Sequence, residues 1–179
     1  MEETISQKEL KARKILENLV QDNRIFMDTC SIIDASDLFW KHIKPFLTKY
    51  EKKIIVPTRC CEELVKKSRD EKDAGLAKTA NTRLFLLQTL QTEGFVEFRG
   101  EKTDNFADNV FLSVFTKFRL QHNLLLITQD NKLAQDIVNL NNSGSQKSVH
   151  IVKVRRINKY NYFKKTKPMN RPKHCVLSQ

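Results

Sequence analysis

The hydrophobic and polar positions of this chain follow two alternating patterns. Short apolar runs are typical of buried strands, and they lie at 25–27, 52–57, 94–98, 123–128 and 149–154. Between them, apolar residues recur every three or four positions, which predicts helices at 6–22, 37–49, 58–68, 76–92, 104–118 and 130–140. Short strands that alternate with helices indicate βαβ units. We therefore predict an α/β fold, a three-layer α/β/α sandwich with a mostly parallel central sheet.

The length of 179 residues suits one domain of ordinary size. We divide the chain into a helical lead-in over 1–23, an α/β domain over 24–154 and a C-terminal tail over 155–179. No apolar run approaches the ~20 residues that a membrane helix needs, and the polar N-terminus lacks the apolar stretch of a signal peptide. With 4 Gly in the whole chain, neither a dinucleotide-binding glycine motif nor a P-loop is present.

The cysteines point to a reducing environment. Cys30, Cys60, Cys61 and Cys175 show neither the spacing of a zinc site nor that of a disulfide framework. We therefore expect free thiols, and a protein of the cytoplasm or another reducing compartment.

Positive charge is concentrated towards the C-terminus. The chain carries 32 Lys and Arg against 21 Asp and Glu, a net charge of +11, yet residues 137–179 hold ten of the basic residues and no acid. The first 136 residues are left with 22 basic and 21 acidic residues, a net charge of +1. Such an asymmetry favours a polyanionic partner, and nucleic acid before a membrane.

The tail also interleaves aromatic and basic side chains. Aromatic rings stack on unpaired bases while Lys and Arg bind phosphates, so we expect RNA contacts from this segment. The expected contacts are Arg155, Arg156, Lys159, Tyr160, Tyr162, Lys164 and Lys165. The alternative is a solvated tail whose aromatic residues pack on the domain.

Acidic residues follow or precede the predicted strands at four places. Asp28 ends the first strand, and Asp130 lies just beyond the fourth, after Thr128 and Gln129. Glu62 and Glu63 lie in the helix after the second strand, and we expect Glu62 to pair with Lys66 four positions later. In parallel sheets, sites form at the carboxyl ends of the strands, where these acids can converge.

Two further acids, Asp104 and Asp108, open the helix that leads to the fourth strand. At about 100° per residue, Asp108 falls within the apolar arc formed by Phe111, Leu112 and Phe115. A carboxylate on that face is costly unless it is paired or binds a metal ion. Taken alone, each acid is better explained as a helix cap or an ion-pair partner. Together, and without a His or Cys ligand set, they favour a hard cation, Mg²⁺ or Mn²⁺.

The order of these motifs resembles the PIN-domain ribonucleases over residues 24–154. The matching segments are FMDTCSII, IIVPTRCCEELVKK, ADNVFLSVF and LLLITQDNKLA. The resemblance implies a PIN-like nuclease domain in which Asp28, Glu63, Asp108 and Asp130 bind one or two divalent ions and carry the catalysis. Asp104 is the alternative for the third acid or an outer-sphere ligand, and Thr128 is a further outer-sphere candidate.

Two positions depart from the pattern of the family. Cys30 stands where Asn or Ser is usual, and Gln129 stands where Asn is usual. Neither change removes a carboxylate, and Ser31 is a candidate to replace the missing polar group at Cys30. We do not expect Cys30 to be a nucleophile, because the neighbouring acids raise the pKa of its thiol.

The sequence therefore predicts a metal-dependent endoribonuclease that cleaves single-stranded RNA with an activated water molecule. The alternative is a non-catalytic RNA-binding or assembly module that retains the fold. The resemblance also implies a protein partner, either an antitoxin or an RNA-processing protein, and is compatible with a homo-oligomer.

Overall fold

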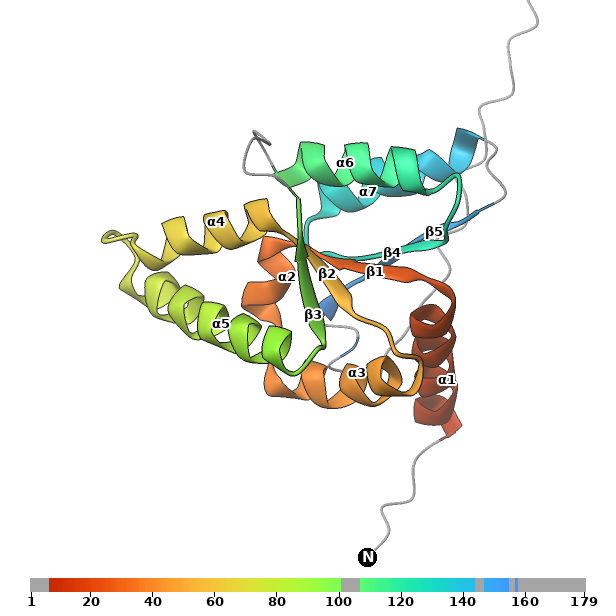
Figure 1. Ribbon diagram of the computed structural model, residues 1–179, viewed down its shortest axis with the longest axis horizontal. Helices are drawn as coiled ribbons and strands as arrows, with labels where there is room; N and C mark the ends of the chain where they lie inside the picture. Colours follow the sequence, from red (N-terminus) through yellow and green to blue (C-terminus); the bar gives the residue numbers. More distant parts are fainter. Residues whose placement is uncertain (1–6, 101–106, 144–146, 155–156, 158–179) are drawn as a thin grey trace, which may run out of the picture.

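The computed structural model describes residues 7–100, 107–143, 147–154 and 157 (Figure 1). Five strands form one sheet in the order β3-β2-β1-β4-β5, and every neighbouring pair is parallel. They are β1 (Arg24–Met27), β2 (Ile54–Pro57), β3 (Val96–Arg99), β4 (Leu124–Ile127) and β5 (Val149–Val152). The register pairs Ile25 with Ile54 on one side of β1 and with Leu125 on the other.

Helices connect the strands and cover both sides of the sheet. They are α1 (Gln7–Asp22), α2 (Thr29–Asp34), α3 (Asp37–Lys49), α4 (Thr58–Ser68), α5 (Ala74–Thr92), α6 (Ala107–Phe118) and α7 (Asn131–Asn139), followed by the short 3₁₀ helix η1 (Leu140–Ser143). Figure 1 shows α6 and α7 above the sheet and α2 and α3 below it, while α4 and α5 form a hairpin at one side. The predicted α/β class with a parallel central sheet is confirmed.

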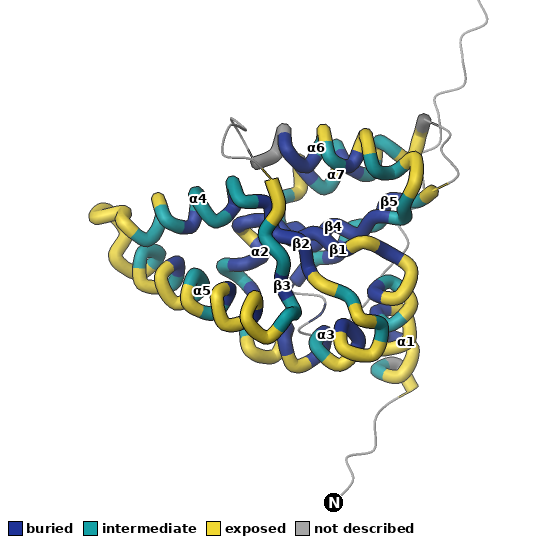
Figure 2. The backbone as a smooth tube through the Cα atoms, viewed as in Figure 1, coloured by how far each residue is buried: buried dark blue, intermediate teal, exposed yellow. Residues whose placement is uncertain are grey.

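The burial of each strand follows its place in the sheet. All four residues of β4 and of β2 are buried, because these strands have a neighbour on each side and helices above and below. The edge strands β3 and β5 are only partly buried, and β3 overlaps the strand predicted at 94–98. Figure 2 shows this buried centre between helices whose outer sides are exposed.

The first helix contributes to the same core. Ala12, Leu16 and Val20 lie on one side of α1, and all three are buried in the core cluster. Towards the other end of the described chain, Val154 and Ile157 are also part of this cluster. Apolar packing therefore extends from α1 to Ile157.

One helix was not predicted. Helix α2 has only six residues, and Thr, Ser and Ile make up most of it, so it carries neither helical periodicity nor strong helix formers. Asp28 directly precedes this helix, with extended backbone angles (φ −89°, ψ 170°), and its carboxylate caps the first turn. The cap and the packing of Ile32 in the core stabilise this helix.

Candidate functional site at the carboxyl edge of the sheet

The carboxyl ends of β1 and β4 lie next to each other in the middle of the sheet. From β1 the chain passes to β2 on one side, and β4 lies on the other side, so the direction of winding reverses between these two strands. Ligand sites of open α/β sheets form at such a reversal. Asp28 and Asp130 follow the two strands that meet there.

Asp28 is buried, and both of its carboxylate oxygens accept hydrogen bonds. The backbone N–H of Ser31 donates to Oδ1 over 2.7 Å, which caps α2. The hydroxyl group of Thr128, a fully buried residue at the end of β4, donates to Oδ2. Asp28 is thus held by its own helix and by the neighbouring strand.

Thr128 also links Asp28 to Asp130. The backbone N–H of Asp130 donates to Thr128 Oγ1 over 3.0 Å. The Asp130 carboxylate in turn accepts the backbone N–H of Leu133 over 3.0 Å and caps α7. Thr128 was expected as an outer-sphere ligand, and its hydroxyl group bridges these two segments.

Glu63 reaches the same place from helix α4. The hydroxyl group of Thr29, the first residue of α2, donates to Glu63 Oε2 over 2.7 Å. Because Thr29 is buried and follows Asp28 directly, this bond fixes Glu63 beside the first turn of α2. Three of the four predicted acids, Asp28, Glu63 and Asp130, therefore gather around that turn.

The electrostatics reflect this gathering. Burial is the main cause that raises the pKa of Asp28 above its ordinary value, and the Asp130 carboxylate raises it further. Hydrogen bonds from Thr128 and Ser31 act in the opposite direction. Clustered carboxylates that repel one another in this way favour a bound cation, and their oxygen atoms are the donors that Mg²⁺ and Mn²⁺ prefer.

The exposed thiol of Cys30 lies at the rim of this group. Partial burial of this thiol is the main cause that raises the pKa of Cys30. The carboxylates of Asp28, Asp130 and Glu63 raise this pKa further, whereas Lys67 lowers it. The expectation that the acids raise this pKa is confirmed. A thiol that stays protonated is a poor nucleophile.

The third predicted acid is only partly described. Asp108 is the second residue of α6, and α6 returns from β3 to β4, so its first turn points to the carboxyl edge of the sheet. The side chain of Asp108 and the whole of Asp104 lie outside the described residues, as do the predicted RNA contacts Arg155, Arg156, Lys159, Tyr160, Tyr162, Lys164 and Lys165. Within the described residues, no group of three or more His, Cys, Asp or Glu side chains is close enough to hold a metal ion.

Three polar contacts of this edge were not predicted. They are the bond from Thr29 to Glu63, the cap from Ser31 to Asp28, and the bond from Lys153 Nζ to the backbone oxygen of Asp130 over 3.1 Å. The Asp-Thr pair was visible as a motif, but no sequence pattern indicated the partner of Thr29. For Lys153, 23 positions from Asp130, no local signal exists.

The predicted pairing of Glu62 with Lys66 is wrong. Glu62 Oε2 accepts a hydrogen bond from Arg59 over 2.7 Å, one turn before it on α4. A spacing of three residues, as for Arg59 and Glu62, and one of four, as for Glu62 and Lys66, both bring side chains together on a helix. Glu62 therefore points to Arg59, whereas the adjacent Glu63 points to Thr29.

No protein-family model matches this chain, and neither does any curated protein. None of the described helices is long and apolar enough to cross a membrane.

Proposed function

We propose that this chain is a divalent-metal-dependent endoribonuclease of the PIN-like type, which cleaves phosphodiester bonds of single-stranded RNA. One observation carries the proposal. Asp28, Glu63 and Asp130 come from three separate segments, and all three lie near the first turn of α2, where the winding of the parallel sheet reverses. The basic excess at residues 137–179 supports a polyanionic substrate.

In this proposal Asp28, Glu63, Asp130 and Asp108 hold Mg²⁺ or Mn²⁺. An ion held by these residues would supply an activated water molecule and offset negative charge on the scissile phosphate. The residues of the chain orient the carboxylates that hold it. Thr128 fixes Asp28 against β4, Thr29 fixes Glu63 against α2, and the helix caps fix Asp28 and Asp130. Such supporting hydrogen bonds keep ligands in place before the ion binds.

A second candidate function is a non-catalytic RNA-binding or assembly module with the same fold. It is favoured by one observation: both Asp28 oxygens already accept hydrogen bonds from other residues of the chain. Metal-dependent cleavage separates the two functions.

The test compares two neighbouring carboxylates on α4. Glu63→Gln removes a carboxylate of the acidic group, whereas Glu62→Gln makes the same change at a residue that pairs with Arg59. We expect Mn²⁺-dependent cleavage of a labelled single-stranded RNA to fall roughly 100-fold or more in Glu63→Gln and Asp28→Asn. A metal ion supplies several kcal/mol of transition-state stabilisation, and each ~1.4 kcal/mol is a factor of ten in rate. Glu62→Gln should cleave as the wild type does.

The outcome is read in MnCl₂ and in EDTA. Cleavage that persists in EDTA, or that Glu63→Gln and Asp28→Asn leave unchanged, contradicts the assigned site. RNA binding without cleavage by the wild-type protein in Mg²⁺ and in Mn²⁺ supports the non-catalytic module instead.

A further inference from the structure

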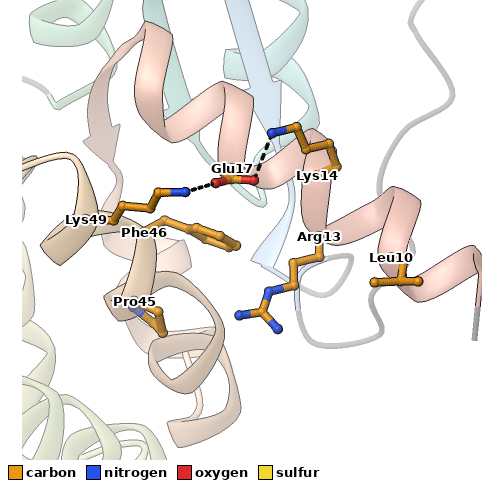
Figure 3. Close-up of a pocket in the computed structure, with 7 residues that line it drawn as sticks. All are labelled: Leu10, Arg13, Lys14, Glu17, Pro45, Phe46 and Lys49. Carbon is orange, nitrogen blue, oxygen red and sulfur yellow. Dashed lines mark hydrogen bonds and ion pairs between the residues drawn. The ribbon is translucent and has the colours of Figure 1, made fainter. Parts of the chain in front are cut away.

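A cationic groove lies between α1 and α3, away from the acidic edge of the sheet (Figure 3). Its volume is about 300 Å³, and it shares no lining residue with the acidic group. Leu10, Arg13, Lys14 and Glu17 line it from α1, and Phe46 and Lys49 are among the α3 residues that line it. This volume is at the lower end of the range of binding pockets.

The lining has an excess of positive charge. It contains three cations, Arg13, Lys14 and Lys49, and one carboxylate, Glu17. Glu17 accepts hydrogen bonds from Lys49 over 2.6 Å, from the hydroxyl group of Tyr50 over 2.8 Å and from Lys14 over 3.1 Å. These bonds lower the pKa of Glu17 to about 2, so Glu17 stays ionised at neutral pH. Its carboxylate is already paired with Lys14 and Lys49.

Arg13 is the cation that Glu17 does not neutralise. Its guanidinium group lies over the ring of Phe46, 5.7 Å from the ring centroid. Within the described part of the chain it forms no ion pair and no hydrogen bond, and Figure 3 shows it pointing into the groove between Leu10 and Pro45. A guanidinium group that keeps all its donors open on an aromatic face is suited to bind a carboxylate through two parallel hydrogen bonds.

The apolar surface that remains open is aliphatic. Leu10 is 53% exposed, and Pro45 is exposed on the opposite rim. Phe46 is only 6% exposed and its ring lies under Arg13, so it offers no open face on which a nucleobase could stack. These surfaces favour an aliphatic side chain over a base.

We propose that this groove binds an acidic segment of a partner protein, with an aliphatic side chain on Leu10 and Pro45 and a carboxylate on Arg13. Lys14 and Lys49 form the cationic rim that attracts such a segment and repels a basic one. Arg at the centre of a contact, next to apolar side chains, is typical of the residues that dominate binding energy. The proposal does not depend on the nuclease site, because the two share no residue.

The test uses the full chain and a fluorescent twelve-residue peptide in which Leu stands at every fourth position and Glu elsewhere. Two control peptides replace all Glu by Gln or all Leu by Ala. Fluorescence anisotropy should show binding of the Glu/Leu peptide and at least tenfold weaker binding of both controls. Arg13→Gln should weaken binding of the Glu/Leu peptide about tenfold. Arg69→Gln makes the same charge change at an exposed arginine at the end of α4 and should leave binding unchanged.

Leu10→Gln provides a second variant that changes a half-exposed side chain without touching the core, and it should also weaken binding. Equal binding by Arg13→Gln and wild type overturns the proposal. It is also overturned if single-stranded RNA displaces the peptide and itself binds Arg13→Gln more weakly, because the groove is then a nucleic-acid site. A dimer of the chain that the peptide dissociates would assign the groove to a second copy and overturn it as well.

Discussion

Asp28 places an ionisable carboxyl group where the fold removes water. Burial raises its pKa, so its carboxylate costs folding energy once it is ionised. Between the ordinary pKa of an aspartate and the raised one, the folded state binds more protons than the unfolded state, and stability falls as pH rises through this window. A bound cation would offset both the cost of burying the Asp28 carboxylate and its repulsion by Asp130.

Asp28→Asn should therefore stabilise the metal-free protein at neutral pH. Asn caps a helix as well as Asp does, so the first turn of α2 is retained. We expect the Tm to rise by roughly 2–4 °C, which is about 1 kcal/mol for a chain of this length. The gain should vanish below about pH 4, where Asp28 is protonated in both states. Thermal unfolding in EDTA, at neutral and at acidic pH, measures the difference in Tm between Asp28→Asn and the wild type.

The control for this change is Asp37→Asn, at an exposed aspartate in the first turn of α3. It should not raise the Tm, because its carboxylate is solvated and favours the N-terminus of the helix. A lower Tm for Asp28→Asn at neutral pH would show that the bonds from Thr128 and Ser31 outweigh the cost of burial.

At the scale of the elements, Asp130 directly precedes helix α7 and its carboxylate caps the first turn. Asp130→Ala should lower stability by about 1 kcal/mol, because it leaves backbone N–H groups of the first turn without the cap, whereas Asp130→Asn should cost only a few tenths. Both should lose Mn²⁺-dependent cleavage if Asp130 holds the ion. Chemical denaturation measures the change in stability, and the cleavage assay measures the loss of activity.

Helix α5 offers a matched pair of controls. Asp73 caps α5 in the same way, accepting the N–H of Leu76 over 2.8 Å, but it is not part of the acidic group. Asp73→Ala and Asp73→Asn should repeat the stability pattern and leave cleavage intact. If Asp130→Asn cleaves like the wild type, Asp130 is a cap and nothing more.

At the scale of the whole molecule, charge is separated along the chain. Five of the ten basic residues beyond position 136 lie within residues 164–179. Replacing these five by Gln should weaken RNA binding and reduce its salt dependence by up to ~0.7 per lost phosphate contact. Cleavage of saturating RNA should persist, because the acidic group is unchanged. Binding measured over a series of salt concentrations gives the slope.

The same experiment needs a control within the described residues. Lys72→Gln and Lys78→Gln remove exposed lysines at the tip of the α4–α5 hairpin and at the start of α5. A slope that falls equally in both sets of variants would indicate a general effect of net charge. A slope unchanged by the five replacements would show that residues 164–179 do not bind RNA phosphates.

Much of the fold follows from the sequence alone, because the local pattern of apolar and polar residues indicates which segments are buried. The short apolar run of β4, bounded by polar residues, is typical of a buried strand, and β4 was predicted to within one residue at each end. An aspartate within a few residues of the end of such a strand predicts a carboxylate at the carboxyl edge, and both Asp28 and Asp130 lie there. The helix over 37–49 was also predicted despite Pro45 in its interior.

Contacts between distant segments were decided only by the tertiary structure. Thr128 and Asp28 are 100 positions apart, and Thr29 and Glu63 are 34 apart, so no periodicity links their side chains. Helix α2 depends on a cap and on core contacts more than on the propensities of its own residues. Local sequence determines which residues are buried and which helix or strand they favour, whereas strand order and crossover direction determine which side chains meet. The sequence therefore indicated each acid separately, and the parallel topology placed Asp28, Glu63 and Asp130 near the first turn of α2.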